Sequence, residues 1–218
     1  MDQKIGTTKV VPREDLRPLF VSERRSVDRF AELISGLKDK VMASEIENPD
    51  QICKRLEALW NYDLSNLTRK LISRDDPPQI KTEQLYTLEE FFGRMSQKQA
   101  EKIEVEFRKF ASILLLEPKF NIGPSRPVDM YWHLLVLHTQ EYRKFCDTVF
   151  GRFIDHVPGS DDTRDHSRKA YNRAVQTYRK LFGDPDESVW GALKIGEDDN
   201  CGVGSNAGCK GWTCGEGM

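Results

Sequence analysis

The sequence predicts an all-α fold: a helical hairpin, then an antiparallel four-helix domain, then a flexible C-terminal tail rich in glycine and cysteine. Three observations predict it. Hydrophobic residues make up 38% of the 218 residues and charged residues 31%, a composition typical of highly charged helical proteins. Apolar residues recur at three- and four-residue steps. Proline, asparagine and serine signals separate these runs, and we expect no strand beyond short possibilities near Thr8–Val11.

Residues 1–22 contain Pro12 and Pro18 among mixed charges and predict an irregular leader. Residues 23–76 predict the hairpin. Its first helix begins near Ser26, and its second begins at Asn48-Pro49, where asparagine suits the N-cap and proline the first turn. The two apolar stripes are Val27, Phe30, Leu33, Ile34, Leu37, Val41 and Met42, and then Ile52, Leu56, Leu59, Trp60, Leu67 and Leu71.

Residues 79–195 predict the main helical domain, after a boundary or linker at Arg74–Pro78 where the helical pattern breaks. Capping-box signals at Thr87–Glu90 and Ser96–Gln99 open a short helix and then a long one that reaches about Leu116. A further helix follows the polar start at 160–162 and ends before Gly183.

The segment Pro127–Pro158 is the centre of this domain and predicts one continuous helix. Pro127 suits a first turn, and Gly151 is a plausible stop. The apolar stripe consists of Val128, Trp132, Leu135, Tyr142, Phe145 and Val149, with a seven-residue gap between Leu135 and Tyr142.

Candidate chemistry in this segment rests on its acidic and histidine residues. Asp129 and His133 are four apart and meet on one helix face. On a continuous helix His138 points about 140° away from His133, and Cys146 lies about 20 Å further along. We therefore favour a structural interpretation, in which Asp129 caps the helix and orients His133. The alternative is a metal-binding protein or metal-dependent enzyme centred on Asp129, His133 and His156, with His156 or His166 returning from another element.

Cys146 is best interpreted as a core thiol beside Tyr142 and Phe145, and Cys53 as another. A nucleophilic cysteine would need a base within reach and a depressed pKa. The chain has no P-loop, GxSxG or HExxH motif, and we predict no catalytic residue.

The central motif resembles the glycine-rich-domain-containing family, a helical domain found in bacteria and in larger plant proteins. The resemblance rests on Val128-Asp129, Trp132-His133, Tyr142, Cys146, Phe150-Gly151-Arg152 and Asp155-His156, with Glu106–Phe110 upstream, and covers about residues 95–190. It implies a helical fold and a pocket formed by Asp129, Trp132, His133, Tyr142, Cys146, Arg152 and His156. The chain departs from many relatives at Leu135, His138 and Asp155, which weakens any site that needs a second histidine there.

The tail, residues 196–218, holds seven of the 15 glycines together with Cys201, Cys209, Trp212 and Cys214. Glycine at this density is costly to order, so we expect a mobile tail. Its cysteine spacing is not the paired spacing of a zinc site. The leading functional hypothesis is a non-enzymatic binding or scaffold protein that presents these residues to a protein partner or modifying enzyme.

Charge and composition limit the other functions. The net charge is −2, and no Lys/Arg run exceeds two residues, so we expect no duplex nucleic acid partner. The longest aliphatic runs are too short to span a membrane. Five cysteines and a start without an apolar signal core predict a reduced, cytoplasmic protein. No cofactor is expected, and a transition metal is the alternative.

Overall fold

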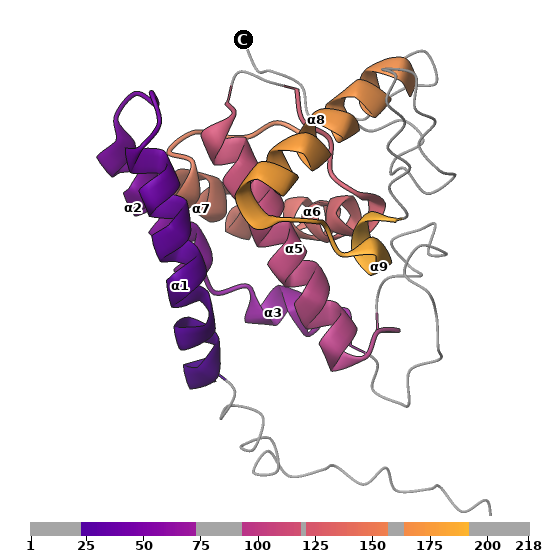
Figure 1. Cartoon of the computed structure of the whole chain (residues 1–218). Coiled ribbons are helices and arrows are strands. Elements are labelled where there is room, and N and C mark those ends of the chain that lie inside the picture. The colour runs from indigo at the N-terminus through magenta and orange to yellow at the C-terminus, as the bar shows by residue number, and fades with distance from the viewer. Residues whose placement is uncertain (1–22, 73–92, 119–120, 157–163, 192–218) are drawn as a thin grey trace, which may run out of the picture.

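The computed structural model describes residues 23–72, 93–118, 121–156 and 164–191, and these ranges consist of helices joined by short connections (Figure 1). The helices are α1 (Glu23–Met42), α2 (Pro49–Asn61), α3 (Ser65–Thr68), α5 (Gln97–Leu116), α6 (Arg126–Leu137), α7 (Thr139–Val149), α8 (Arg164–Phe182) and α9 (Glu187–Trp190). In these ranges β pairing is limited to a single parallel bridge between Ile72 and Met95. The all-α prediction is confirmed.

The helices α1 and α2 lie side by side at one edge of the molecule and form the predicted hairpin (Figure 1). Asn48 precedes α2 with φ 55°, and Pro49 occupies the first turn, as the sequence predicts. The Asn48 side chain makes no cap hydrogen bond. Asparagine suits this position because it adopts the left-handed conformation more readily than most residues. Met42 was expected in the apolar stripe, but it is the last residue of α1 and is 57% exposed.

The second helix is shorter than its apolar stripe predicts. It ends at Asn61, and the buried residues Leu67 and Leu71 belong to α3 and the segment after it. The Arg108 guanidinium of α5 donates hydrogen bonds to the backbone carbonyls of Leu59 and Tyr62. These bonds satisfy carbonyls that another helical turn would otherwise have used. Of the predicted stripe, Ile52 is half-buried and the other residues are buried, but the single long helix is wrong.

Helix α5 is the central element and contacts α2, α3, α6 and α8. It begins with the predicted capping box, in which the Ser96 side chain accepts from the Gln99 backbone and the Gln99 side chain accepts from the Ser96 backbone. Phe107 and Phe110 are buried along its length. Its aromatic side chains therefore lie where they can contact the central motif of α6 and α7.

A buried carboxylate fixes α8 and α9 to α5. Glu106 is 3% exposed, and its Oε2 accepts hydrogen bonds from the Tyr178 hydroxyl and the Trp190 indole, both at 2.8 Å. Lys109 donates to Oε1 at 2.8 Å. The four-residue helix α9, which delivers Trp190, was not predicted, because so short a segment carries no periodic pattern.

The continuous helix predicted through Pro127–Gly151 is wrong. His138 separates α6 from α7 with φ −91° and ψ 66°, which is not a helical conformation. Its Nδ1 donates to the Leu134 carbonyl at 2.7 Å, and its Nε2 lies against the Lys70 amine. The two helices pack against each other, and α7 also packs against α2. Because of the break, α6 packs against α5 while α7 packs against α2, although both helices carry residues of the same apolar stripe.

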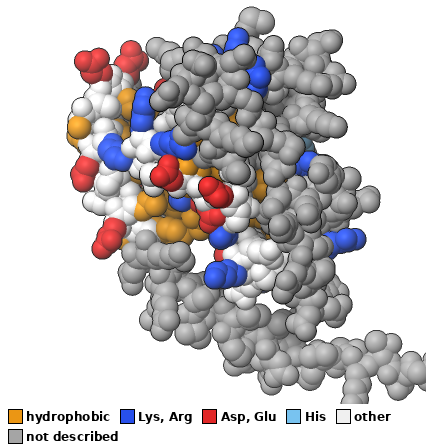
Figure 2. All heavy atoms as spheres, turned by 45° about the vertical axis from the view of Figure 1, so that its right-hand side comes forward, with side chains coloured by type: hydrophobic (Ala, Val, Ile, Leu, Met, Phe, Trp, Pro, Cys, Tyr) orange, Lys and Arg blue, Asp and Glu red, His pale blue; other side chains and the backbone are white. Residues whose placement is uncertain are grey.

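Several predictions fall on residues outside the described ranges: the leader 1–22, the strand near Thr8–Val11, the linker at Arg74–Pro78, the helix opening at Thr87, and the tail 196–218. None of the helices in the described ranges combines the length and apolar content needed to cross a membrane. On the described part of the face in Figure 2, acidic and basic side chains are interspersed, and neither sign of charge dominates.

Candidate metal centre

The first part of the candidate site is built into the start of α6. Ser125 precedes the helix, Pro127 lies in its first turn, and Asp129 and His133 follow one turn apart on the same face. The Nδ1 of His133 lies 2.7 Å from the Asp129 backbone carbonyl and 3.3 Å from the Asp129 carboxylate. A carbonyl oxygen only accepts, so Nδ1 carries the proton. The neutral ring then has its lone pair on Nε2, the state in which histidine binds a metal.

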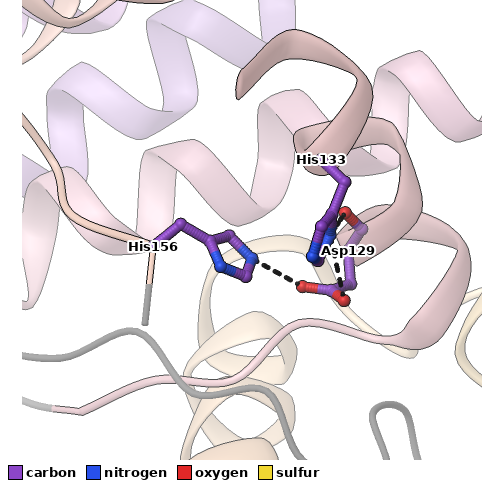
Figure 3. A group of neighbouring side chains, drawn as sticks. All are labelled: Asp129, His133 and His156. Atoms are coloured by element: carbon purple, nitrogen blue, oxygen red, sulfur yellow. Dashed lines mark hydrogen bonds and ion pairs between the residues drawn. The ribbon is translucent and has the colours of Figure 1, made fainter. Parts of the chain in front are cut away.

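The third residue arrives from the segment after α7. Gly151 adopts φ 65°, and its backbone N–H donates to the Cys146 carbonyl at 2.9 Å. This left-handed turn ends α7 and reverses the chain, as glycine commonly does at a helix end. His156 then lies with Nε2 at 3.1 Å from Asp129 Oδ1. Figure 3 shows both imidazoles directed at the same carboxylate, one from α6 and one from the returning segment.

Aromatic packing holds the two imidazoles together. The ring centroids of His133 and His156 are 4.2 Å apart, and the His156 ring also meets the edge of Trp132 at 4.8 Å. The Asp129 side chain is 1% exposed, that of His156 6% and that of His133 11%. A carboxylate this deeply buried requires hydrogen-bonding or charged partners, because its desolvation is costly.

The three side chains could ligate one metal ion. Each offers a ligand atom, and these atoms all lie within 4.8 Å of one another. With metal–ligand bonds of about 2.1 Å, adjacent ligand atoms are roughly 3.0 to 3.4 Å apart. The 3.1 Å separation between Asp129 Oδ1 and His156 Nε2 already meets this requirement.

Cys146 lies in the core and not in the Asp-His-His cluster. It is fully buried, and burial raises the pKa of its thiol above the ordinary value, although hydrogen bonds with the Ile154 backbone and the Tyr142 side chain oppose the shift. A thiol of raised pKa is a poor nucleophile at neutral pH. Burial also raises the pKa of Cys53. The position of Cys146 agrees with the prediction of a core thiol, whereas Cys53 is only partly buried and packs against the edge of the core.

The remaining predicted site residues are divided between the core and the surface. Trp132 and Tyr142 are buried, and the Trp132 indole donates to the Tyr142 hydroxyl at 3.2 Å. Arg152 is exposed and lies outside the buried group. His138 forms the break between α6 and α7, away from the cluster. The side chain of His166 and the tail residues Cys201, Cys209, Trp212 and Cys214 lie outside the described residues.

Two contributors to the site were not predicted from the sequence. Gly151 was expected only to stop a helix, whereas its turn also returns His156 to Asp129. Ile154 was not singled out, yet its backbone carbonyl accepts a hydrogen bond from Tyr142. The gap in the apolar stripe between Leu135 and Tyr142 is the signal that could have indicated a break and hence a returning segment.

The fold and the site define an all-helical protein with a buried Asp-His-His cluster. A family model described as UCP032817-like matches residues 55–179, more than half of the 218-residue chain, and the chain belongs to this family. No curated protein and no solved structure gives a significant match. The matched region begins within α2 and ends within α8, so it contains the whole cluster. The match to this family does not support the predicted membership of the glycine-rich-domain-containing family, and the description of the family names no activity.

Proposed function

We propose that this protein binds a divalent transition metal through Asp129, His133 and His156. The observation that carries the proposal is the convergence of three ligand atoms, within 4.8 Å, from two chain segments that are distant in sequence. The proton position on His133 supports it. Metal-bound histidines almost always donate their second ring N–H to a carbonyl or carboxylate, as His133 does to the Asp129 carbonyl.

The donor set limits the metals. Two imidazoles and one carboxylate suit Zn²⁺, Fe²⁺, Co²⁺ and Ni²⁺ better than Ca²⁺ or Mg²⁺, which prefer oxygen ligands. Within the described ranges three side chains converge, which leaves at least one coordination position for water or an oxygen-donor ligand. Catalytic metal sites share this feature, whereas structural zinc sites are closed by four protein ligands. The proposal therefore extends to a metal-dependent enzyme.

The test begins with the full chain purified without an affinity tag or chelator. Metal content is measured by mass spectrometry, and the apo-protein is titrated with Zn²⁺ by calorimetry and with Co²⁺ by absorption. We expect one equivalent to bind, and H133A or H156A to weaken it by more than the roughly 10- to 100-fold typical of supporting residues. H138A is the matched control, because His138 adjoins the same helix but lies outside the cluster.

The tail cysteines are soft-metal ligands, so the titration is repeated on the C201S/C209S/C214S chain. Binding that persists in this variant and disappears in H156A comes from the candidate site. A chain that folds without metal and binds none, or that binds equally well as H133A and H156A, contradicts the proposal.

A second candidate function is the scaffold role, which the concentration of cysteine and glycine in residues 196–218 favours. In it, the tail is presented to a protein partner or modifying enzyme. Intact-mass measurement on protein from the native host tests it directly. A modified tail, or loss of a bound partner when 196–218 is deleted from an otherwise folded chain, supports this role. An unmodified mass with freely alkylated Cys201, Cys209 and Cys214 counts against modification.

A further inference from the structure

The backbone just before His156 is held by two side chains of α7. The Tyr142 hydroxyl donates a hydrogen bond to the Ile154 carbonyl. Cys146, one helical turn further along α7, forms a hydrogen bond with the Ile154 backbone. Tyr142 is 2% exposed and Cys146 is fully buried. The segment is thus anchored two residues before the imidazole that reaches the Asp129 carboxylate.

The same hydroxyl is tied to α6. The Trp132 indole N–H donates to it at 3.2 Å. Trp132 is adjacent to His133, and its ring edge meets the His156 ring at 4.8 Å. Tyr142 therefore links the helix that carries two of the candidate ligands to the segment that carries the third. The Phe153 ring adds an edge contact on Tyr142 at 5.2 Å between centroids.

Tyr142 differs in this respect from the other buried tyrosines. The Tyr131 hydroxyl bonds Thr68, the Tyr171 hydroxyl donates to the Trp190 carbonyl, and the Tyr178 hydroxyl donates to Glu106. The Tyr131 bond joins α6 to α3, and the other two join α8 to α9 and to α5, so none of these three bonds reaches the segment that carries His156. A phenylalanine at position 142 would fill nearly the same core volume, so packing alone does not explain why this residue carries a hydroxyl. Two of its partners, the Trp132 indole and the Ile154 carbonyl, belong to the segments that carry the candidate ligands.

We propose that Tyr142 is a positioning residue for the metal centre: its hydroxyl, oriented by Trp132, holds the Ile154 carbonyl so that His156 meets Asp129 and His133. The inference rests on the proposed function. It assigns the motif residues Trp132, Tyr142 and Cys146 to geometry and not to chemistry. Groups that orient a metal ligand typically change metal affinity by about 10- to 100-fold when they are removed.

The experiment compares Y142F with Y131F in the full chain. Tyr131 is the matched control because it is buried, adjoins Trp132 and also loses one hydroxyl hydrogen bond, with Thr68 at 2.7 Å. Both variants are titrated with Co²⁺, the visible spectrum of the bound ion is recorded, and unfolding by urea is measured in parallel. The Co²⁺ spectrum reports coordination geometry, which a loss of stability alone would not change.

We expect Y142F to bind Co²⁺ about 10- to 100-fold more weakly than wild type and with an altered spectrum, while Y131F keeps the wild-type affinity and spectrum. Equal affinity and spectrum in Y142F and wild type would overturn the inference and leave the metal site intact. A wild-type chain that binds no metal overturns the proposed function instead.

If Y142F does not fold, W132F decides the matter. Phenylalanine keeps an aromatic ring beside His156 but removes the N–H that orients the Tyr142 hydroxyl. A several-fold weaker affinity with a changed spectrum supports the positioning role, and an unchanged titration overturns it.

Discussion

The Asp129 carboxylate and the His156 imidazole are 27 residues apart in sequence, yet Oδ1 and Nε2 lie 3.1 Å apart. The contact exists because α7 ends at Val149 and the chain turns back after Gly151, so that His156 packs against Trp132. Of the three candidate ligands, Asp129 and His133 are close in sequence, whereas His156 comes from a distant segment. The site is therefore a product of tertiary structure, and its properties should depend on how the returning segment is held.

Metal binding should stabilise the native chain. An ion that binds the folded state and not the unfolded state adds RT ln(1 + [M]/Kd), about 2.7 kcal/mol at 100 times Kd. We expect Zn²⁺ to raise the midpoint of thermal unfolding and a chelator to reverse the shift. In H156A the midpoint should be independent of Zn²⁺. An equal Zn²⁺-induced shift in wild type and H156A would contradict binding at this cluster.

Replacing Gly151 by alanine should destabilise the fold and weaken metal binding. Gly151 adopts φ 65°, where an L-residue costs roughly 1 to 2 kcal/mol, and an added Cβ would clash with the Arg55 guanidinium. The guanidinium is the flexible end of a long side chain, so R55A in the same background should recover only the steric part of the loss. Urea unfolding measures the first effect, and Co²⁺ titration measures the second.

Gly36 provides the control for this substitution. It lies within α1, and nothing is within 4 Å of an added Cβ. G36A should therefore stabilise the chain by about 0.5 to 1 kcal/mol and leave metal affinity unchanged. A G151A chain as stable as G36A would show that the turn does not need glycine.

Much of the fold could be predicted because its signals are local. The restart at Asn48-Pro49 and the capping box at Ser96 are short-range features, and the structure has both. The breaks at Tyr62 and His138 could not be predicted in the same way. The first depends on Arg108, which arrives from α5, and the second involves Lys70, which is distant in sequence. No proline or glycine marks either point.

The candidate site was predicted as a set of residues but not as an arrangement. The four-residue spacing of Asp129 and His133 is visible in the sequence, because helix geometry alone brings them together. The approach of His156 requires the turn at Gly151 and the anchoring by Tyr142, which are tertiary relationships.

Removing the Tyr178 hydroxyl should destabilise the fold without changing metal affinity. Tyr178 donates to the Glu106 carboxylate at 2.8 Å, and Glu106 is 3% exposed. A hydrogen bond to a buried charge contributes roughly 1.5 to 3 kcal/mol, so we expect a loss of this size for Y178F in urea unfolding. Y62F is the comparison, because the Tyr62 hydroxyl bonds Glu141 in an exposed setting. The free energy of unfolding should fall less in Y62F than in Y178F, by about 1 kcal/mol or below. Equal losses would show that burial of Glu106 adds nothing.

Acid pH should weaken the stabilising contribution of Asp186, which caps α9. Burial acts to raise the pKa of this carboxyl, but hydrogen bonds from Lys102 and Ser188 outweigh it and hold the pKa below the ordinary value. The unfolded chain, with a carboxyl pKa of about 3.9, then binds the proton more tightly than the folded chain. The contribution of the Asp186 carboxylate to the free energy of unfolding is therefore fully present above about pH 4. It is lost as the pH falls through the pKa that this carboxyl has in the folded chain.

Asparagine also caps helices well, so D186N keeps the cap and removes the titration. Between pH 5 and pH 2, roughly the range over which a paired carboxylate protonates, the free energy of unfolding of D186N should fall less steeply than that of wild type. K102M should flatten the curve in the same direction, because Lys102 Nζ lies 2.8 Å from Asp186 Oδ2. Urea midpoints measured at half-unit pH steps make the comparison. Parallel curves for wild type and D186N would mean that the Lys102 pair does not contribute to folding, leaving Trp190 and its bond to Glu106 to hold α9 in place.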